Sequence, residues 1–322
     1  MANPRVSVCI PVYNLELYIA EALNSLKAQT FQDYEAIIVN DGSTDRSEEI
    51  IAPYLEDPRF RYISQENGGV ARARETATLA AKGEWFAHLD GDDIWMPNKL
   101  ERQLALADED KRTNFLYSNL IQFTETGQES VPYTKPMPEG DITADLYRDN
   151  FVGTSTVMIK TADIAAVGGY PIRPYGEDYL MWLRIARNGI WARMCMEPLV
   201  RYRLRGQSQV SDRLLNLNKQ IGIMSDALER EDRPQYVRIL NAGLANVKRN
   251  IAYEMARKAS RGEEGNIEQL LWQSWNCSKQ GLKRLAMATM FSLSRITHIK
   301  AGRNIVMRML QRLTDREALA DQ

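Results

Sequence analysis

A cluster of three carboxylates stands out in the sequence, which reads DGDD at positions 90–93 and directly follows the apolar stretch 85–89. Like charges held so close together repel one another, and a bound divalent cation relieves that repulsion. Mg²⁺ and Mn²⁺ bind to carboxylates and complete their coordination with the phosphate oxygens of a substrate. For an isolated cluster, a solvated acidic turn that caps the helix near Pro97 is the better explanation. The position at the end of an expected strand, beside other polar loops, favours the metal site.

Two residues at the ends of neighbouring expected strands have the chemistry to bind a nucleotide base. Asp41 lies in the polar sequence NDGSTD at 40–45, and Tyr13 follows the first strand. A base needs an acceptor for its ring N–H and an aromatic face, and these two side chains could supply them. Positions 40–45 also fit a common turn and helix N-cap. Tyr13 fits an ordinary aromatic residue at a strand end equally well.

The sequence NGGVARAR at 67–74 opens an expected helix with two glycines, which let the backbone approach a ligand closely. Such a helix start could receive a phosphate. Arg72 and Arg74 are candidates for the same anion, although a solvated helix face suits at least one of them better. No two glycines are spaced as GxG and no Gly-Lys pair occurs, which argues against Rossmann dehydrogenases and P-loop NTPases.

Further candidates lie nearer the C-terminal end of this region. Asp178 is the third residue of GED at 176–178, at the start of an expected helix. The helix dipole keeps such a carboxylate charged, which suits either a cap or a general base, and the sequence alone favours the cap. The basic stretch RYRLR at 201–205 could close over a pyrophosphate or be an exposed strand end. His88 shares a strand face with Asp90 and is expected in the core rather than as a ligand.

The elements that must position these residues alternate between strands and helices. Continuous apolar runs predict strands, and apolar residues three or four apart predict helices. Strands are expected at 6–12, 36–39, 61–63, 85–89, 115–117, 156–159 and 199–204, and helices at 19–26, from Asp45, at 70–81, 99–107 and 178–188, with a long loop at 124–141. This order predicts an α/β fold with a mainly parallel sheet and helices on both faces. Ligands bind beyond the carboxyl ends of such strands, where the polar clusters stand.

Strand signals vanish after about residue 212. Apolar residues with heptad-like spacing at 214–228 and 237–251, separated by a turn at 232–234, predict an antiparallel helical hairpin. Further helices are expected at 267–279 and 282–313. We therefore expect a catalytic α/β domain at 1–212 and an all-helical region at 213–322.

The composition is that of a globular protein, and the charge is divided unevenly along the chain. The 322 residues carry 41 Lys and Arg against 42 Asp and Glu. Residues 1–212 hold 22 of the basic and 31 of the acidic side chains, so the first region is acidic and the second is basic.

Cysteine and histidine usage excludes several kinds of site. The three cysteines are widely spaced without a CxxC pair, so neither a disulfide framework nor a zinc site is expected, and a reduced, cytoplasmic compartment is favoured. The two histidines are too few for a histidine dyad or a multi-histidine metal site. The first residues lack a signal-peptide pattern, and no apolar run is long enough to cross a bilayer.

Five stretches, in this order, closely resemble the family 2 inverting glycosyltransferases of the GT-A fold. They read VSVCIPVYN, QTFQDYEAIIVNDGSTD, NGGVARAR, KGEWFAHLDGDDIWMPNKLE and GEDYLMWLRIARNG, and they cover residues 5 to about 205. Two positions depart from the family pattern. Glu75 replaces a frequent Asn and weakens the case that Arg74 binds phosphate, and His88 replaces an apolar residue.

The resemblance implies roles for individual residues. Pro11, Tyr13 and Asp41 would bind the nucleobase, usually uracil, and Arg74 stays a candidate for nucleotide binding. Asp90 and Asp92 would form the DxD pair, with Asp92 or Asp93 on the metal and a neighbour on the ribose. Asp178 would be the general base that removes the acceptor proton. The cofactor is then Mn²⁺ or Mg²⁺. The metal neutralises the charge that develops on the β-phosphate, and displacement in one step inverts the anomeric carbon.

The resulting expectation is transfer of a sugar from a nucleotide donor, with UDP favoured, to an acceptor hydroxyl in cell-surface polysaccharide or glycolipid synthesis, with no nucleic-acid partner. A nucleotidyltransferase would carry a glycine-rich basic loop near its first strand, and PVYNLELY contains none. A non-catalytic nucleotide-sugar-binding scaffold would have degraded acidic motifs, whereas all of these are present.

The C-terminal stretch 269–314 has no Asp or Glu but eight Lys and Arg, partly beside an apolar helical stripe. A basic amphipathic helix can lie on an anionic membrane surface, which would suit a lipid-linked acceptor. Packing of this helix on the catalytic domain or in a homodimer is slightly favoured, because the stripe is no wider than a core-facing helix requires.

Overall fold

The computed structural model describes residues 3–205 and 213–261 of the chain. The chain divides into two compact units. The first ends at Ser208 and also includes the later segment Arg230–Tyr236, and the second contains the two long helices on either side of that segment.

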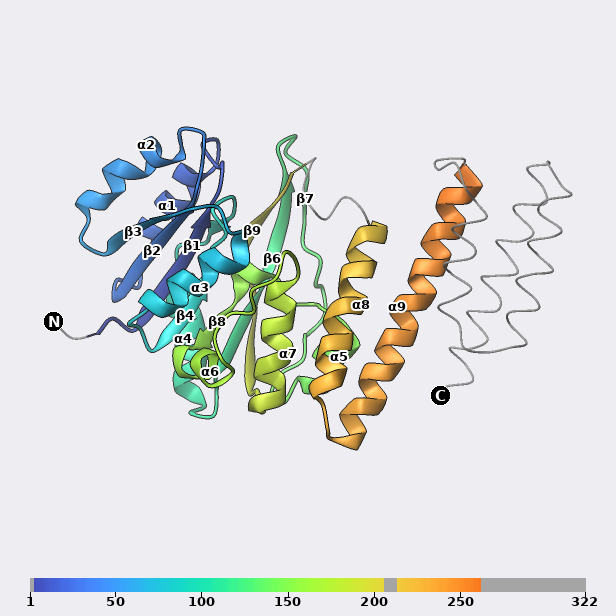
Figure 1. Cartoon of the computed structure of the whole chain (residues 1–322). Helices are drawn as coiled ribbons and strands as arrows, with labels where there is room; N and C mark the ends of the chain where they lie inside the picture. Colours follow the sequence, from blue (N-terminus) through green and yellow to red (C-terminus); the bar gives the residue numbers. More distant parts are fainter. Residues whose placement is uncertain (1–2, 206–212, 262–322) are drawn as a thin grey trace, which may run out of the picture. The chain divides into compact units, whose positions relative to one another are not determined.

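One mixed, mostly parallel sheet organises the first unit (Figure 1). Its strands are β1 (Val6–Val12), β2 (Tyr34–Asp41), β3 (Phe60–Gln65), β4 (Trp85–His88), β5 (Ile94–Trp95), β6 (Phe115–Thr124), β7 (Glu129–Ser130), β8 (Met158–Lys160) and β9 (Ala192–Leu204). The order is β3-β2-β1-β4-β8-β6-β9-β5, with β7 paired to β6. Strands β3, β2, β1 and β4 are parallel, whereas β8 runs antiparallel to both of its neighbours. The carboxyl ends of β1, β2 and β4 therefore meet at one edge.

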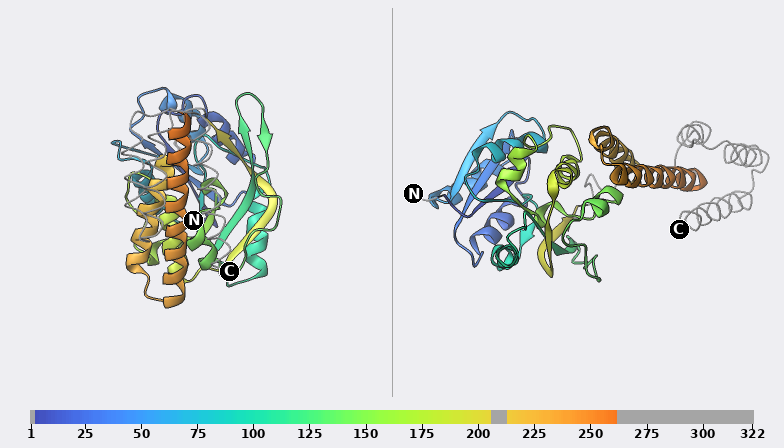
Figure 2. Two further views of the ribbon diagram at one scale, coloured as in Figure 1. Left: turned by 90° about the vertical axis from the view of Figure 1, so that its right-hand side faces the viewer. Right: turned by 90° about the horizontal axis from the view of Figure 1, so that it is seen from below.

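Helices cover both faces of this sheet (Figure 2). They are α1 (Ile19–Lys27), α2 (Ser47–Ile51), α3 (Val70–Ala80), α4 (Lys99–Glu109), α5 (Thr143–Arg148), α6 (Thr161–Ala166) and α7 (Glu177–Gly189), with short 3₁₀ helices η1 (Ala52–Glu56) and η2 (Thr154–Thr156). Alternate residues of β1, such as Val8 and Ile10, pack with α1 and α4. On the opposite face Trp182 of α7 packs edge-on against His88 at 5.4 Å. The expectation of an α/β fold with helices on both faces is confirmed.

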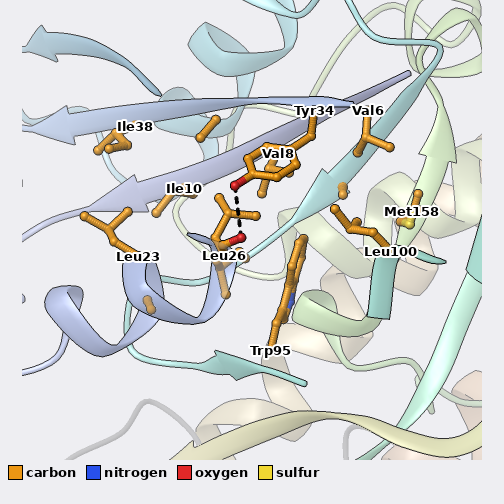
Figure 3. Packing of buried hydrophobic residues seen from close by; sticks show 14 of the residues in the cluster. Val6, Val8, Ile10, Leu23, Leu26, Tyr34, Ile38, Trp95, Leu100 and Met158 are labelled. Atoms are coloured by element: carbon orange, nitrogen blue, oxygen red, sulfur yellow. Dashed lines mark hydrogen bonds between the residues drawn. The ribbon is translucent and has the colours of Figure 1, made fainter. Parts of the chain in front are cut away.

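The core beneath α1 and α4 is closely packed (Figure 3). Leu23 and Leu26 of α1 lie in one cluster with Trp95, which belongs to β5. The buried hydroxyl of Tyr34 donates a hydrogen bond of 3.0 Å to the carbonyl oxygen of Leu26. Burial of these side chains attaches α1 to the sheet, so the loop after β1 starts from a fixed position.

The sheet is larger than the sequence indicates. Strand β6 runs to Thr124 rather than ending near residue 117, and β9 begins at Ala192 rather than near 199. The expected loop at 124–141 contains β7, and β5, α5 and α6 were not expected at all. The long parallel pairing of β6 with β9 stabilises residues whose own strand signal is weak, so pairing overrides local propensity.

A buried carboxylate anchors the segment Arg230–Tyr236 to the first unit. Glu231 accepts a hydrogen bond from the hydroxyl of Tyr147 in α5, two of 2.8 Å from the guanidinium of Arg233 and one of 3.1 Å from the backbone N–H of Arg233. The guanidinium of Arg233 lies 4.3 Å from the ring centre of Tyr236, whose hydroxyl donates to Asp141. These contacts hold the turn between the two long helices against the sheet unit.

Apart from the residues within Arg230–Tyr236, the second unit contains α8 (Arg213–Arg230) and α9 (Pro234–Arg261). The two helices expected at 214–228 and 237–251 are confirmed. Buried apolar residues recur every three or four positions of α9, at Leu240, Leu244, Val247 and Ile251. In residues 3–205 and 213–261, none of the helices combines the length and apolarity that a membrane span requires. The helices expected at 267–279 and 282–313, and the basic stretch 269–314, lie outside the described residues.

Candidate functional site

The loops that follow β1 and β2 are joined by hydrogen bonds. Asn14 adopts a left-handed conformation with φ of 52°, and its backbone N–H donates to Ser43 Oγ at 3.0 Å. In return, Thr44 N–H donates to Asn14 Oδ1 at 2.8 Å. Pro11 is buried within β1, while 49% of Tyr13 is exposed at the rim. Of these two expected base-binding residues, only Tyr13 presents its ring to a ligand from outside.

Asp41 ends β2 with a carboxylate that is buried and largely satisfied. Its Oδ1 accepts hydrogen bonds from Gln65 Nε2 at 2.6 Å and from Gly68 N–H at 3.0 Å, and its Oδ2 accepts one from Gly69 N–H at 2.8 Å. Gly69 has φ of 85°, a conformation that favours glycine. Asp41 therefore fixes the glycine turn that starts α3, and one of its roughly four acceptor positions remains for a base N–H.

Arg74 of α3 is buried and links α7 to the loop at residues 90–93, which we call the acidic loop. Its Nη2 donates to Asp90 at 2.6 Å, and its Nη1 donates to Glu177. Burial by itself lowers the pKa of Arg74, but the negative charge of Asp90 and the groups around it outweigh this and place the pKa well above its usual range. The guanidinium is thus committed to two carboxylates, and the sequence did not indicate Glu177 as a partner.

The three carboxylates of the acidic loop have different surroundings. Asp90 and Asp92 are partly exposed, with 25% and 18% of their side chains accessible. Arg205 Nη2 lies 2.8 Å from Asp92 Oδ2 and forms an ion pair with it. Asp93 is 1% exposed and accepts hydrogen bonds from Ser155 Oγ at 2.6 Å and from Arg203 N–H at 2.9 Å.

Burial dominates the protonation of this loop. It raises the pKa of Asp92, and the charge of Asp90 adds to that effect while Arg205 opposes it. Burial, together with the charges of Asp92 and Asp90, raises the pKa of Asp93 well above its usual range. The charged forms of Asp92 and Asp93 are therefore costly in this loop, and a positive charge placed beside them would offset that cost.

Asp178 stands in the first turn of α7. The cap position is Gly176, which is left-handed and has no side chain to cap the helix. Asp178 Oδ1 accepts a hydrogen bond of 2.6 Å from Tyr179 N–H, one of the first-turn amides that have no partner within the helix, and its Oδ2 accepts one of 2.6 Å from Thr154 Oγ1. Asp178 therefore satisfies an amide at the helix start, as the sequence indicated, and also contacts a residue outside α7.

Tyr202 of β9 lies within the electrostatic influence of the acidic residues. Burial raises the pKa of its hydroxyl, and the charges of Asp93, Asp90, Asp92 and Asp178 raise it further. The two loops that carry these carboxylates are joined through η2, because Thr154 Oγ1 donates to Asp178 Oδ2 and Ser155 Oγ donates to Asp93 Oδ2, each at 2.6 Å.

His88 is a core residue, as expected. It is buried among the rings of Phe86, Tyr170 and Trp182, and its Nε2 lies 3.2 Å from the hydroxyl of Tyr170. Burial, helped by the positive charge of Arg74, lowers the pKa of His88 well below its usual range. A neutral, enclosed imidazole of this kind supports the α7 packing rather than the chemistry.

Comparisons with known proteins agree with this geometry. A family model described as Glycosyl transferase family 2 matches residues 7–164. TuaG of Bacillus subtilis, a putative teichuronic acid biosynthesis glycosyltransferase, is 33% identical over 220 residues, which are 66% of this chain and 83% of TuaG. WfgD of Escherichia coli, a UDP-Glc:alpha-D-GlcNAc-diphosphoundecaprenol beta-1,3-glucosyltransferase, is 29% identical over 231 residues, 71% of this chain and 88% of WfgD.

Other relatives are much longer than the matched region. An uncharacterized glycosyltransferase of Rickettsia felis is 32% identical over 191 residues, 57% of this chain. The chain spans only 32% of the length of that relative.

Solved structures share the fold. Staphylococcus aureus TarS in complex with UDP-GlcNAc has a TM-score of 0.67 and 19% identity over 97% of this chain and 92% of that chain. The mannosyltransferase PcManGT of Pyrobaculum calidifontis, in complex with GDP-Man and Mn²⁺, has a TM-score of 0.63 and 16% identity over 100% of this chain and 89% of that chain. With the GT-A fold in common and TuaG matched over most of its length, this chain belongs to glycosyltransferase family 2.

Proposed function

We propose that this chain transfers a sugar from a nucleoside diphosphate to an acceptor hydroxyl with inversion at the anomeric carbon. The single observation that carries the proposal is that one short turn, η2, joins the two sets of carboxylates: Thr154 donates to Asp178, while Ser155 donates to Asp93 and accepts from Asp90 N–H. Asp90 and Asp92 are suited to the donor, and Asp178 is hydrogen-bonded to Thr154, which lies outside its own helix.

The donor end is assigned to the loops after β1, β2 and β4. The exposed ring of Tyr13 offers a stacking face for the base, and the remaining acceptor position of Asp41 suits a ring N–H. Asp90 is partly exposed and suits the ribose hydroxyls. UDP is the favoured nucleotide, because WfgD is named for UDP-Glc and TarS was solved with UDP-GlcNAc.

Asp92 is the residue that we assign to a Mn²⁺ or Mg²⁺ ion. In the described part of the chain, no three His, Cys, Asp or Glu side chains are grouped to hold a metal. That is compatible with an ion that takes one carboxylate from the protein and its other oxygens from a diphosphate. Asp92 fits because its carboxylate is partly exposed and already faces a cation, Arg205, whereas both oxygens of Asp93 are engaged in buried hydrogen bonds. When bound, the metal would neutralise charge on the departing diphosphate.

Asp178 then acts as the general base. The acceptor hydroxyl gives its proton to Asp178, its oxygen forms a bond to the anomeric carbon, and the bond from that carbon to the β-phosphate oxygen breaks on the opposite side. The nucleoside diphosphate leaves with the electron pair. Arg203 and Arg205 stand beside the acidic loop, where their positive charge suits the released diphosphate.

The acceptor is proposed to belong to a cell-surface polysaccharide or glycolipid, on the cytoplasmic side of the membrane. The names of TuaG and WfgD support this class, since one refers to teichuronic acid and the other to a diphosphoundecaprenol-linked sugar.

The test is release of nucleoside diphosphate from a panel of UDP- and GDP-sugars, with Mn²⁺, with Mg²⁺ and with chelator. We expect metal-dependent release by the wild-type chain. Calorimetry should show that Asp92→Ala loses the metal-dependent affinity for UDP while its circular dichroism stays unchanged. Unchanged, metal-independent affinity in this variant would contradict the metal assignment. No release from any donor, with or without metal, would contradict the function.

A further inference from the structure

The 3₁₀ turn η2, Thr154–Thr156, is buried at the centre of the site although no sequence motif pointed to it. All three of its side chains are buried. Each hydroxyl makes a hydrogen bond to a different partner, and two of these partners are site carboxylates.

The first residue of the turn contacts the proposed base. Thr154 Oγ1 donates to Asp178 Oδ2 at 2.6 Å. Because Tyr179 N–H donates to the other oxygen, also at 2.6 Å, the carboxylate plane is fixed by one donor on each side. A hydrogen bond to an ionised carboxylate is stronger than one between neutral groups.

The second residue contacts the donor side of the site. Ser155 Oγ donates to Asp93 Oδ2 at 2.6 Å and accepts from Asp90 N–H at 3.1 Å. Asp178 and the acidic loop are therefore hydrogen-bonded to neighbouring residues of one short turn. Their separation is set by that turn rather than by the longer path through α7 and the sheet.

Side chains of β5 and α4 donate hydrogen bonds to the backbone of this turn. Trp95 Nε1 donates to Ser155 O at 2.9 Å, and Gln103 Nε2 donates to Thr156 O at 2.8 Å. Lys99 is fully buried, donates to Gln103 Oε1 at 2.7 Å and lies 4.0 Å from the ring centre of Trp95. Side chains of α4 and β5 thus fix the carbonyl groups of Ser155 and Thr156.

We infer that Thr154 is a positioning residue for Asp178, and that its hydroxyl aligns the base with the acceptor oxygen. The inference rests on the proposed function, because it assumes that Asp178 removes the acceptor proton. A displacement of a catalytic group by about 1 Å can reduce turnover about 100-fold, so loss of this hydrogen bond is expected to act on kcat. The nucleotide site does not include Thr154, so KM for the donor is expected to stay unchanged.

The experiment compares three variants of the full chain with the wild type, using the nucleotide sugar that the wild type accepts in the panel above. Thr154→Val keeps the shape but removes the hydroxyl, and kcat should fall about 10- to 100-fold with an unchanged donor KM. Thr154→Ser keeps a hydroxyl that can donate the hydrogen bond to Asp178, and its turnover should stay within about threefold of the wild-type value. Thr156→Val is the matched control, because it removes a buried hydroxyl of the same turn that bonds only to Gly153 O.

Melting temperatures separate positioning from folding. Thr154→Val and Thr156→Val should lose similar stability, while only the former loses turnover; should Thr154→Val not fold, Thr154→Ala removes the same hydroxyl. Equal turnover of the two Val variants, with Asp178→Asn inactive, overturns the inference and leaves the proposed function intact. Wild-type turnover of Asp178→Asn overturns both.

Discussion

The buried carboxylate of Glu231 should govern how the stability of the first unit depends on pH. Hydrogen bonds from Arg233 are the largest cause that lowers its pKa from the ordinary value of 4.5 to about 2. One pKa unit corresponds to about 1.4 kcal/mol, so the charged form of Glu231 contributes about 3 kcal/mol to the free energy of unfolding at neutral pH. Because the pKa is lower in the folded state, this stability is present above about pH 5. It is lost as the pH falls toward 2.

Glu231→Gln tests this reasoning by urea denaturation followed by tryptophan fluorescence. At pH 7 we expect the variant to lose about 2–3 kcal/mol, since Arg233 loses its charged partner but remains partly exposed, with 34% of its side chain accessible to water. At pH 3 the loss should be clearly smaller, because Glu231 is then already protonated in the unfolded chain, so the folded state's preference for the charged form contributes less. Glu229→Gln is the matched control, because it makes the same chemical change at an exposed position two residues away. A loss at pH 7 no larger than that of Glu229→Gln, or a loss that persists undiminished at pH 3, would refute the argument.

Three further outcomes are expected. Asp178→Asn should reduce turnover by roughly two to four orders of magnitude with little change in melting temperature, and near-normal turnover would remove Asp178 from the mechanism. Gly83→Ala should lower the free energy of unfolding, measured by urea denaturation, by about 1–3 kcal/mol, because the added methyl group would lie 2.5 Å from Ser7 N and 2.7 Å from the carbonyl carbon of Val6. An unchanged free energy of unfolding would mean that the start of β1 can shift to make room for the methyl group. Full-length chain should sediment with anionic vesicles at low salt and release at high salt, unlike a chain ending at Gly281, and equal behaviour of the two would exclude membrane contact through the basic stretch.

The fold could be predicted from the sequence where one residue pattern determined one element. The apolar run of β1 and the helical spacing of α3 and α7 are strong local signals. Strand β5 is only two residues long and depends on its pairing with β9, so local pattern could not reveal it. The antiparallel direction of β8 is likewise set by its neighbours, β4 and β6.

The sequence indicated candidate site residues but not their contacts. The acidic loop was identified because clustered charge at a strand end is costly without a function, and Asp178 was assigned as a base by the family resemblance. Arg74 was expected to face a ligand, whereas the structure gives it Asp90 and Glu177 as partners. Thr154 went unnoticed because a hydroxyl in a loop has no distinctive pattern, and its partner lies 24 positions away.

The link through Arg74 also has a consequence for synthesis of the protein on the ribosome. Arg74 and Glu177 are separated by 103 positions. At about 5–20 residues per second, the partner of Arg74 is translated about 5–20 s after Arg74 itself. The strands that carry Tyr13, Asp41 and Asp90 can pair during that interval, but the charge on Arg74 has only one of its two carboxylates. The pairing of β1, β2, β3 and β4 can therefore precede translation of α7, whereas the second carboxylate of Arg74 and the strand β9, which lies between β6 and β5, arrive only late in synthesis.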